Sequence, residues 1–538
     1  MTKNRYLLDC TLRDGGYIND WEFGHDNLVN VFERVVAAGV DVIEIGFLDE
    51  RRNFDINRSI MPDTASAEKI YGKLKHAHTM VVGMIDYGTC DITHLQPCKE
   101  SFLDGIRVIF KKEKLLPAME FCRQVKTLGY KVFAQLVSVS SYSDEELKSA
   151  VAIANDVHPY ALSMVDTYGL LNPTSLLHIL KIIDSSLDSD ICLGFHAHNN
   201  FQLGYINAMT VLESGISRDV LVDGSLYGMG KSAGNAPLEL IAMSMNEKFD
   251  KSYQVSEMQE AIITSIIDFQ KKSPWGYQLF YYIAASNRVH PNYVSYLMNK
   301  RTLSITEINE ILQKIPEDQK LKKNGKLIEE LYLNYQKKDC NDQETLQKLK
   351  TKLANQKLLV IGPGTSVKKC ENLIQNYIHK EKPIVISINY IPDSFNVDYL
   401  FVTNNSRYLQ MASKLLDEKY YNIPVIASSN ITKYDGNFEY VVNYSNLIDE
   451  KAEFPDNSMC MLIKLLEKID CKEITLAGLD GYTADNVNYF DADKEYSFLK
   501  EKAEVLNRYG RNFFRMHNER IQARFLTASL YEEKKNDY

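Results

Sequence analysis

The chain has 538 residues, of which 45% are hydrophobic and 25% charged, and its formal net charge is −9. These values are typical of a globular protein with two or three domains. The acidic balance and the lack of a long Lys/Arg patch argue against nucleic-acid binding, and no apolar run approaches the ~20 residues of a membrane span.

The N-terminal residues lead directly into a predicted strand and show no signal-peptide pattern. The nine cysteines are scattered without CxxC spacing. An odd number of cysteines in a chain without an export signal is typical of reduced thiols. The sequence therefore predicts a cytoplasmic protein in which the cysteines are small core residues.

From residue 5 to about 246, short apolar runs rich in β-branched residues alternate with amphipathic stretches. The predicted strands are 6–10, 40–47, 79–85, 105–110, 131–137, 161–165, 191–195 and 220–223. The predicted helices between them include 27–38, 115–128, 144–154, 174–185 and 203–213. Eight strands alternating with helices over roughly this length predict an α/β fold, a closed (β/α)₈ TIM barrel. An open, doubly wound sheet is the alternative.

Residues 250–352 differ from the preceding part because strand signals are absent there. The periodicity predicts amphipathic helices over 255–270 and 305–313, and the many tyrosines of 275–296 are typical of helix packing. The densely charged stretch 314–352 is typical of exposed helix and linker. We therefore expect a catalytic domain at 1–249 and a helical extension with a charged linker at 250–352.

Strands and helices alternate again beyond residue 352. The predicted strands are 358–361, 383–389, 399–403, 424–427, 440–442 and 474–476. They indicate a second, smaller Rossmann-like α/β domain at 353–538. The first strand runs into Gly-Pro-Gly-Thr-Ser at 362–366, which is similar to the turn of domains that bind nucleotides or nucleotide-sugars. The full dinucleotide fingerprint is absent, so a tight turn without a ligand is the alternative.

Two histidines stand one residue apart at the end of a predicted barrel strand, His196 and His198. Side chains alternate along a strand, so both imidazoles point to the same side, as a divalent-metal site requires. A closed barrel carries its active site at the C-terminal ends of its strands and brings the first, seventh and eighth strands side by side. Asp14, which follows the first strand, can therefore join both histidines at one Mn²⁺, Co²⁺, Zn²⁺, Fe²⁺ or Mg²⁺ ion.

Three separated motifs carry a family resemblance: TLRDG at 11–15, HAHN at 196–199, and GMG at 228–230 followed by AGNAPLE at 233–239. In this order they resemble the metal-dependent TIM-barrel lyases and synthases of the HMG-CoA lyase type, with a pyruvate carboxyltransferase-type domain. The glycine-rich segment is most similar to the 4-hydroxy-2-oxovalerate aldolase branch. The resemblance covers roughly residues 5–246.

The resemblance implies roles for individual residues. Asp14, His196 and His198 would ligate the metal, with Mn²⁺ as the first expectation. Arg13 would neutralise the enolate that forms when the C3–C4 bond of a 2-oxo acid breaks, although the pair Arg13–Asp14 alone could also be a buried structural ion pair. The residues expected to contact the substrate are Arg13, Glu44, Thr167 and Asn235.

The chain departs from the aldolase pattern at Tyr17, where the family usually has the histidine that serves as general base. A phenol with a pKa of about 10 is a poor base near neutral pH. His25 or a metal-bound water are the alternatives, and Tyr17 could instead shape the pocket. The acyl-CoA-dependent synthases usually show Glu-Gln after Arg-Asp-Gly, and the pair Gly16-Tyr17 does not match this pattern either.

Together these observations predict a divalent-metal-dependent aldolase that cleaves or forms a 4-hydroxy-2-oxo acid from pyruvate and an aldehyde. If the second domain binds a nucleotide-sugar, the aldehyde can be sugar-derived, as in surface-polysaccharide metabolism. The alternatives are an acyl-CoA-dependent Claisen-type synthase and a non-catalytic binding protein on a retired barrel. The sequence leaves room for a homo-oligomer and predicts neither a nucleic-acid nor a membrane partner.

Overall fold

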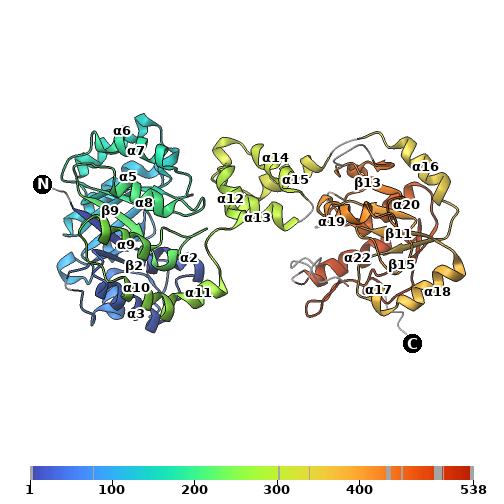
Figure 1. The fold of residues 1–538 in the computed structure, drawn as a ribbon, viewed down its shortest axis with the longest axis horizontal. Coiled ribbons are helices and arrows are strands. Elements are labelled where there is room, and N and C mark those ends of the chain that lie inside the picture. The colour runs from blue at the N-terminus through green and yellow to red at the C-terminus, as the bar shows by residue number, and fades with distance from the viewer. Residues whose placement is uncertain are drawn as a thin grey trace. The chain divides into compact units, whose positions relative to one another are not determined.

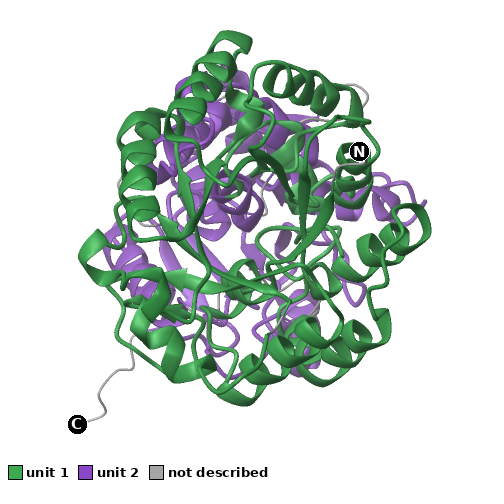
Figure 2. Cartoon of the chain, turned by 90° about the vertical axis from the view of Figure 1, so that its left-hand side faces the viewer, with its two compact units in different colours: residues 1–291 green, residues 292–538 purple. Residues whose placement is uncertain are grey.

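The computed structural model describes residues 4–532 apart from 77, 301–302, 338–339, 432–437, 450–451, 453, 490–499 and 501. The chain divides into two compact units, Met1–Pro291 and Asn292–Tyr538 (Figures 1 and 2). This division lies inside the expected helical extension. The expected domain boundaries at 249/250 and 352/353 remain predictions.

Eight parallel strands of unit 1 close into a barrel. They are β1 (Arg5–Asp9), β2 (Val42–Leu48), β4 (Met80–Asp86), β5 (Gly105–Phe110), β6 (Lys131–Leu136), β7 (Ala161–Asp166), β8 (Cys192–Ala197) and β9 (Val220–Gly224). The order β1-β9-β8-β7-β6-β5-β4-β2 is completed by a direct pairing of β1 with β2, in which Leu8 lies opposite Val42. The closed TIM barrel is therefore confirmed, and the open sheet is excluded for this unit.

Helices surround this barrel, as the green ribbon of Figure 2 shows. They are α3 (His25–Ala37), α4 (Thr64–Tyr71), α5 (Leu115–Thr127), α6 (Asp144–Val157), α7 (Pro173–Asp184), α8 (Gly204–Leu212) and α9 (Leu238–Lys248). Their starts follow local sequence signals. For example, Ser143 and Glu146 form a capping box at α6, and Asn172 caps α7, whose first residue is Pro173.

The barrel topology places the three sequence motifs together. β9 pairs with β1 on one side and with β8 on the other. The short helices α1 (Thr11–Asp14) and α2 (Gly16–Asn19) follow β1 directly, and the glycine-rich segment follows β9. All of these segments lie at the C-terminal ends of the strands, where TIM barrels carry their active sites.

Helices predominate between the barrel and the second sheet, as the periodicity predicts. Unit 1 ends with α10 (Val255–Ala261), a π-helical turn (Ile262–Ile266), α11 (Ile267–Lys272) and α12 (Leu279–Ser286). The following helices are α13 (Pro291–Lys300), α14 (Ile305–Gln313), α15 (Gly325–Gln336) and α16 (Gln343–Leu353). The predicted helices at 255–270 and 305–313 are thereby confirmed.

Unit 2 contains a seven-stranded parallel sheet in the order β14-β13-β12-β11-β10-β15-β16. Its strands are β10 (Leu358–Ile361), β11 (Ile384–Ile388), β12 (Tyr399–Val402), β13 (Val425–Ser428), β14 (Tyr440–Val442), β15 (Glu473–Ala477) and β16 (Gln522–Phe525). The described helices around it are α17 (Ser366–Lys369), α18 (Glu371–Glu381), α19 (Asn405–Leu415), α20 (Ser458–Lys468) and α22 (Ala503–His517). The second α/β sheet is confirmed.

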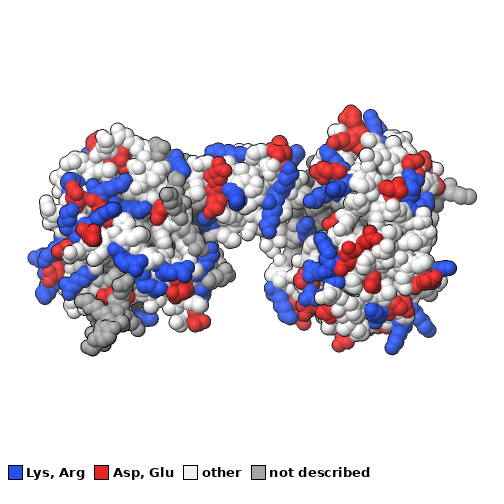
Figure 3. Space-filling view, turned by 180° about the vertical axis from the view of Figure 1, so that it is seen from behind, with Lys and Arg blue, Asp and Glu red and all other residues white. Residues whose placement is uncertain are grey.

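Positive and negative side chains are interspersed on the face of the molecule seen in Figure 3. Within the described segments, no helix combines the length and the apolar character needed to cross a bilayer.

Candidate metal centre

Asp14, His196 and His198 form a compact cluster at the barrel mouth. One ligand atom from each residue lies within 4.8 Å of the others, and the three residues are 1%, 2% and 5% exposed. Neither histidine Nε2 has a hydrogen-bond partner among the described residues. Buried polar atoms without partners are rare in proteins and call for an explanation. One carboxylate and two imidazoles with free Nε2 atoms fit a divalent ion with coordination positions left for substrate.

Hydrogen bonds at Nδ1 turn both imidazoles toward this point. His196 Nδ1 lies 3.0 Å from Asp223 Oδ2, and His198 Nδ1 lies 3.2 Å from the backbone oxygen of Asp166. Asp223 is itself held by Arg107, whose Nη2 donates to Oδ2 at 2.5 Å. A carboxylate that orients a metal-binding histidine fixes its tautomer and raises its basicity. Sequence reasoning missed Asp223, although an aspartate at the end of a buried strand is a signal.

The protonation states of the cluster suit metal binding. Burial opposes the charge on Asp14, but the neighbouring Arg13 guanidinium and the two histidines outweigh it and hold the carboxyl pKa well below its usual range. Burial lowers the pKa of His198 to about 3. At neutral pH the cluster therefore offers an ionised carboxylate and, at His198, a neutral imidazole, which are the forms that bind metals.

Arg13 is fixed by two carboxylates and is only 5% exposed. Its Nη1 donates to Asp14 Oδ1 at 2.5 Å, and its Nε donates to Glu44 Oε2 at 2.7 Å. Glu44 is fully buried, and its Oε2 also lies 3.0 Å from Nη1 of Arg107. Glu44 thus supports the guanidinium from within the barrel, and Arg13 lies directly beside Asp14, a candidate metal ligand.

Asn235 and the glycine-rich segment pack against Asp14. Asn235 Nδ2 donates to Asp14 Oδ2 at 2.8 Å, while its Oδ1 has no partner among the described residues. A Cβ atom at Gly230 would lie 2.3 Å from Asn235 Nδ2 and 2.5 Å from Asp14 Oδ2. Only glycine therefore fits at this position, and the segment encloses the Asp14 carboxylate.

Tyr17 lies at the barrel mouth near these groups. Its ring centroid is 5.0 Å from that of Trp21 and 6.2 Å from that of Phe47, and Phe47 in turn lies 5.8 Å from the Arg13 guanidinium carbon. The residue remains 41% exposed, yet burial of the phenol and the charge of Asp14 raise its pKa to about 12. Tyr17 consequently keeps its proton at neutral pH.

Two other predicted site residues have no described contact with the cluster. His25 begins α3, and its backbone N–H donates to Asn57. Thr167 follows β7, and its hydroxyl oxygen accepts a hydrogen bond from the backbone of Ser138 at 2.8 Å. Among the described residues, no hydrogen bond or ring contact joins either side chain to Asp14.

Lys231 is a second residue that sequence reasoning missed. Its backbone N–H donates to Asp14 Oδ2 at 3.0 Å, and its Nζ lies 5.2 Å from the Tyr17 ring centroid. Burial lowers the pKa of its ammonium group. The sequence did contain a signal for Lys231, because this residue directly follows Gly230 in the glycine-rich segment that the sequence analysis assigned to the site. The barrel mouth therefore contains a lysine in addition to Arg13.

We expect Asp223→Asn to weaken Mn²⁺ binding by roughly 10- to 100-fold, because the orienting charge on His196 is lost. Isothermal titration calorimetry with Mn²⁺ measures this. Asp156→Asn is the matched control, since Asp156 lies on the surface with its side chain 76% exposed. Wild-type Mn²⁺ affinity in folded Asp223→Asn protein would contradict the orienting role.

With this geometry established, comparisons with known proteins identify the barrel. Residues 4–265 match the family model described as HMGL-like. The barrel is an HMGL-like domain. The HMGL-like domain comprises β1–β9 together with α10 and most of the π-helical turn, so it contains every member of the metal cluster.

Two sequence relatives of the HMGL-like domain agree with this result. The chain is 25% identical over 279 residues to a 4-hydroxy-2-oxovalerate aldolase of Marinomonas sp.. This alignment covers 50% of this chain and 79% of the aldolase. It is 24% identical over 251 residues to an oxaloacetate decarboxylase of Mycobacterium tuberculosis, and this alignment covers 45% of this chain and 70% of the decarboxylase. A solved HMG-CoA lyase of Bacillus subtilis aligns with a TM-score of 0.42 at 16% identity, covering 51% of this chain and 95% of that one.

Proposed function

We propose that the HMGL-like domain is a divalent-metal-dependent aldolase acting on a 4-hydroxy-2-oxo acid, with pyruvate and an aldehyde on the other side of the reaction. The observation that carries this proposal is the convergence of Asp14, His196 and His198, with unpartnered Nε2 atoms, beside the fixed guanidinium of Arg13. The aldolases among the relatives support it.

The reaction requires a small number of groups. A divalent ion, Mn²⁺ in our proposal, would supply Lewis acidity toward the 2-oxo group of the substrate. In cleavage, the C3–C4 bond breaks, the 4-hydroxyl loses its proton, and the bonding electrons pass to the pyruvate enolate. Arg13 donates hydrogen bonds where that negative charge develops, and one such fixed donor is worth roughly 3 kcal/mol of barrier. Protonation at C3 then gives pyruvate.

Several residues are proposed to bind the substrate and move the proton. Arg13 and Asn235 would contact the 2-oxo acid directly, and the backbone near Thr167 would bind its carboxylate. Glu44 would act by holding Arg13 in place. For the hydroxyl proton we favour Tyr17 over His25, because Tyr17 lies against Lys231 and Phe47 at the barrel mouth.

The raised pKa of Tyr17 predicts the pH dependence of cleavage. Only the phenolate can take the hydroxyl proton, and below a pKa of about 12 its fraction rises tenfold per pH unit. The cleavage rate is therefore expected to increase from pH 7 to 9, and Tyr17→Phe is expected to lose about 10²-fold in rate and this increase. Initial rates at saturating Mn²⁺ measure both. His25→Ala serves as the comparison, and a pH-rate profile shared by wild type and Tyr17→Phe would exclude Tyr17.

The raised pKa of Tyr17 also favours a second candidate function, decarboxylation. Decarboxylation of an oxaloacetate-type 2-oxo acid breaks a C–C bond to give CO₂ and the same enolate, and it needs no base for a hydroxyl proton. A site in which the Tyr17 phenol keeps its proton at neutral pH suits this reaction. One relative is named for it. Release of CO₂ from oxaloacetate that persists in Tyr17→Phe, with no aldol cleavage in wild type, would favour the decarboxylase.

The proposal is tested by pyruvate release from 4-hydroxy-2-oxo acids with Mn²⁺ present, removed by chelation, and restored. We expect activity to disappear on chelation and to return with Mn²⁺, because the cluster offers the only grouping of three metal-binding side chains found among the described residues. Unchanged turnover after chelation would contradict a metal-dependent aldolase. A sugar-derived aldehyde belongs in the substrate panel, and acyl-CoA with detection of free thiol tests the synthase alternative.

A further inference from the structure

Unit 2 contains a cavity of about 190 Å³. A single water needs only ~10–15 Å³ by a comparable measure, so the cavity has room for an organic molecule. The loops that follow β10, β11, β12 and β15 line it. β11–β14 lie on one side of β10 and β15–β16 on the other, so the cavity lies where the strand order reverses. Open parallel sheets bind their ligands at this point.

The glycine-rich turn after β10 does not have space for a phosphate. Asp480 accepts hydrogen bonds there from the Ser366 backbone N–H at 2.8 Å and from the Thr365 hydroxyl at 3.3 Å. A Cβ atom at Gly364 would lie 2.6 Å from the Asp480 carboxyl carbon. The glycine is therefore required by the packing of Asp480, whose charge would repel a second anion at this turn.

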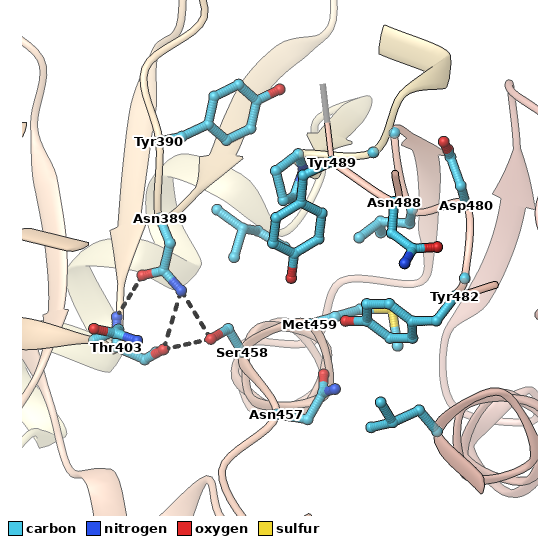
Figure 4. A pocket seen from close by; sticks show the side chains of 18 of the residues that line it. Asn389, Tyr390, Thr403, Asn457, Ser458, Met459, Asp480, Tyr482, Asn488 and Tyr489 are labelled. Atoms are coloured by element: carbon cyan, nitrogen blue, oxygen red, sulfur yellow. Dashed lines mark hydrogen bonds between the residues drawn. The ribbon is translucent and has the colours of Figure 1, made fainter. Parts of the chain in front are cut away.

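The opposite wall of the cavity is formed by the first turns of α19 and α20. Thr403, just before α19, and Ser458, the first residue of α20, are joined by a hydrogen bond of 2.7 Å between their hydroxyls. Asn389 links both, because its Nδ2 donates to Ser458 Oγ at 2.8 Å and its Oδ1 accepts from the Thr403 N–H at 3.0 Å (Figure 4). Two helix N-termini thus meet at one edge of the cavity.

Several positive charges lie along this wall. Each helix N-terminus carries roughly half a positive charge, and Arg407 in the first turn of α19 adds a full charge. Lys300 of α13 also lines the cavity; its Nζ lies 4.9 Å from the Tyr332 ring centroid and forms no ion pair with a described carboxylate. The N–H groups of Ser458 and Met459 donate to no acceptor in the described part of the chain. Asp456 lines the cavity as well, and its Oδ2 accepts hydrogen bonds from the hydroxyls of Tyr332 at 2.6 Å and Tyr444 at 3.4 Å.

Aromatic and apolar side chains line another part of the cavity. The rings of Tyr482 and Tyr489 lie with centroids 6.4 Å apart at an interplanar angle of 53° (Figure 4). Leu506 and Tyr531 lie in the same lining. Surfaces of this kind bind flat rings by stacking, without a need for hydrogen bonds in the ring plane.

We propose that the cavity binds a nucleoside phosphate. The phosphate occupies the edge where α19 and α20 begin, close to Lys300 and Arg407, and the base lies beside Tyr482 and Tyr489. This placement differs from the one that the glycine-rich turn suggests, because Asp480 already fills that turn.

Calorimetric titration of the full-length protein tests this proposal. The probes are the nucleoside mono- and diphosphates of the five common bases, the corresponding nucleosides and inorganic phosphate. We expect at least one nucleoside phosphate to bind at least ~10-fold more tightly than its nucleoside and than inorganic phosphate, since charge-assisted hydrogen bonds and stacking each contribute. Absence of binding by every nucleotide, or equal affinity for inorganic phosphate, would overturn the proposal.

Two substitutions test the placement. Lys300→Ala and Tyr489→Ala are each expected to weaken nucleotide binding by roughly 10-fold, at the phosphate and the base respectively. Lys380→Ala and Tyr421→Ala are the matched controls, because Lys380 has 84% of its side chain exposed and Tyr421 is 69% exposed. Thermal unfolding checks that all four variants fold. Wild-type nucleotide affinity in folded Lys300→Ala overturns the placement of the phosphate. Wild-type affinity in folded Tyr489→Ala overturns the placement of the base.

Discussion

Replacement of Asp14 by asparagine is expected to reduce metal-dependent turnover by at least ~10³-fold. The carboxylate is the only anionic member of the cluster, and removing it weakens the hold on a divalent ion that lowers the barrier by several kcal/mol. The substitution preserves side-chain size, so the hydrogen bond of Asn235 to the remaining oxygen can persist. Turnover at saturating substrate and Mn²⁺ titration by calorimetry measure the two effects.

The control for Asp14→Asn is Asp156→Asn, which removes an exposed charge that pairs with Arg123. We expect this control to keep wild-type turnover and Mn²⁺ affinity. Asp14→Asn removes one ion-pair partner of the buried Arg13 and could therefore disturb the fold. Circular dichroism checks that both variants are folded. Turnover of folded Asp14→Asn within tenfold of wild type would contradict the assignment of Asp14 as a ligand.

Arg13→Lys is expected to lower kcat by about 10²- to 10³-fold while the three proposed metal ligands remain in place. The guanidinium spans Asp14 and Glu44 and can still present N–H groups to the substrate, whereas an ammonium group is a point charge that cannot satisfy these partners together. The loss should appear in kcat more than in Mn²⁺ affinity. Steady-state kinetics and Mn²⁺ titration separate these quantities.

Arg123→Lys is the matched control for Arg13→Lys, because Arg123 forms its ion pairs on the surface with its side chain 42% exposed. It should leave kcat unchanged. A value of kcat near wild type in Arg13→Lys would remove the guanidinium from the proposed reaction, and Arg13 would then be a structural partner of Asp14 and Glu44.

The sequence was sufficient to predict the barrel, because its eight strands are buried runs that alternate with amphipathic helices. The strands that it missed lack this signal. β3 (Ile60–Met61) has two residues, and β16 (Gln522–Phe525) is only partly buried. The spacing of His196 and His198 likewise predicted their common direction, because a two-residue repeat on a strand is local geometry.

The missed site residues depend on tertiary contacts. Asp223 reaches His196 across neighbouring strands, 27 residues away in sequence. Lys231 enters the site because its backbone packs on Asp14, more than two hundred residues distant. The raised pKa of Tyr17 similarly reflects the groups that the barrel gathers around it. No periodicity or motif in one segment contains this information.

The most direct test of the proposed chemistry uses pyruvate alone and needs no knowledge of the aldehyde. The protein is incubated with pyruvate and Mn²⁺ in D₂O, and the pyruvate methyl signal is followed by NMR. We predict Mn²⁺-dependent loss of this signal in wild type and none in Asp14→Ala, because enolate formation exchanges the methyl protons. Methyl exchange no faster in wild type than in Asp14→Ala would contradict a pyruvate enolate at the Asp14–His196–His198 site.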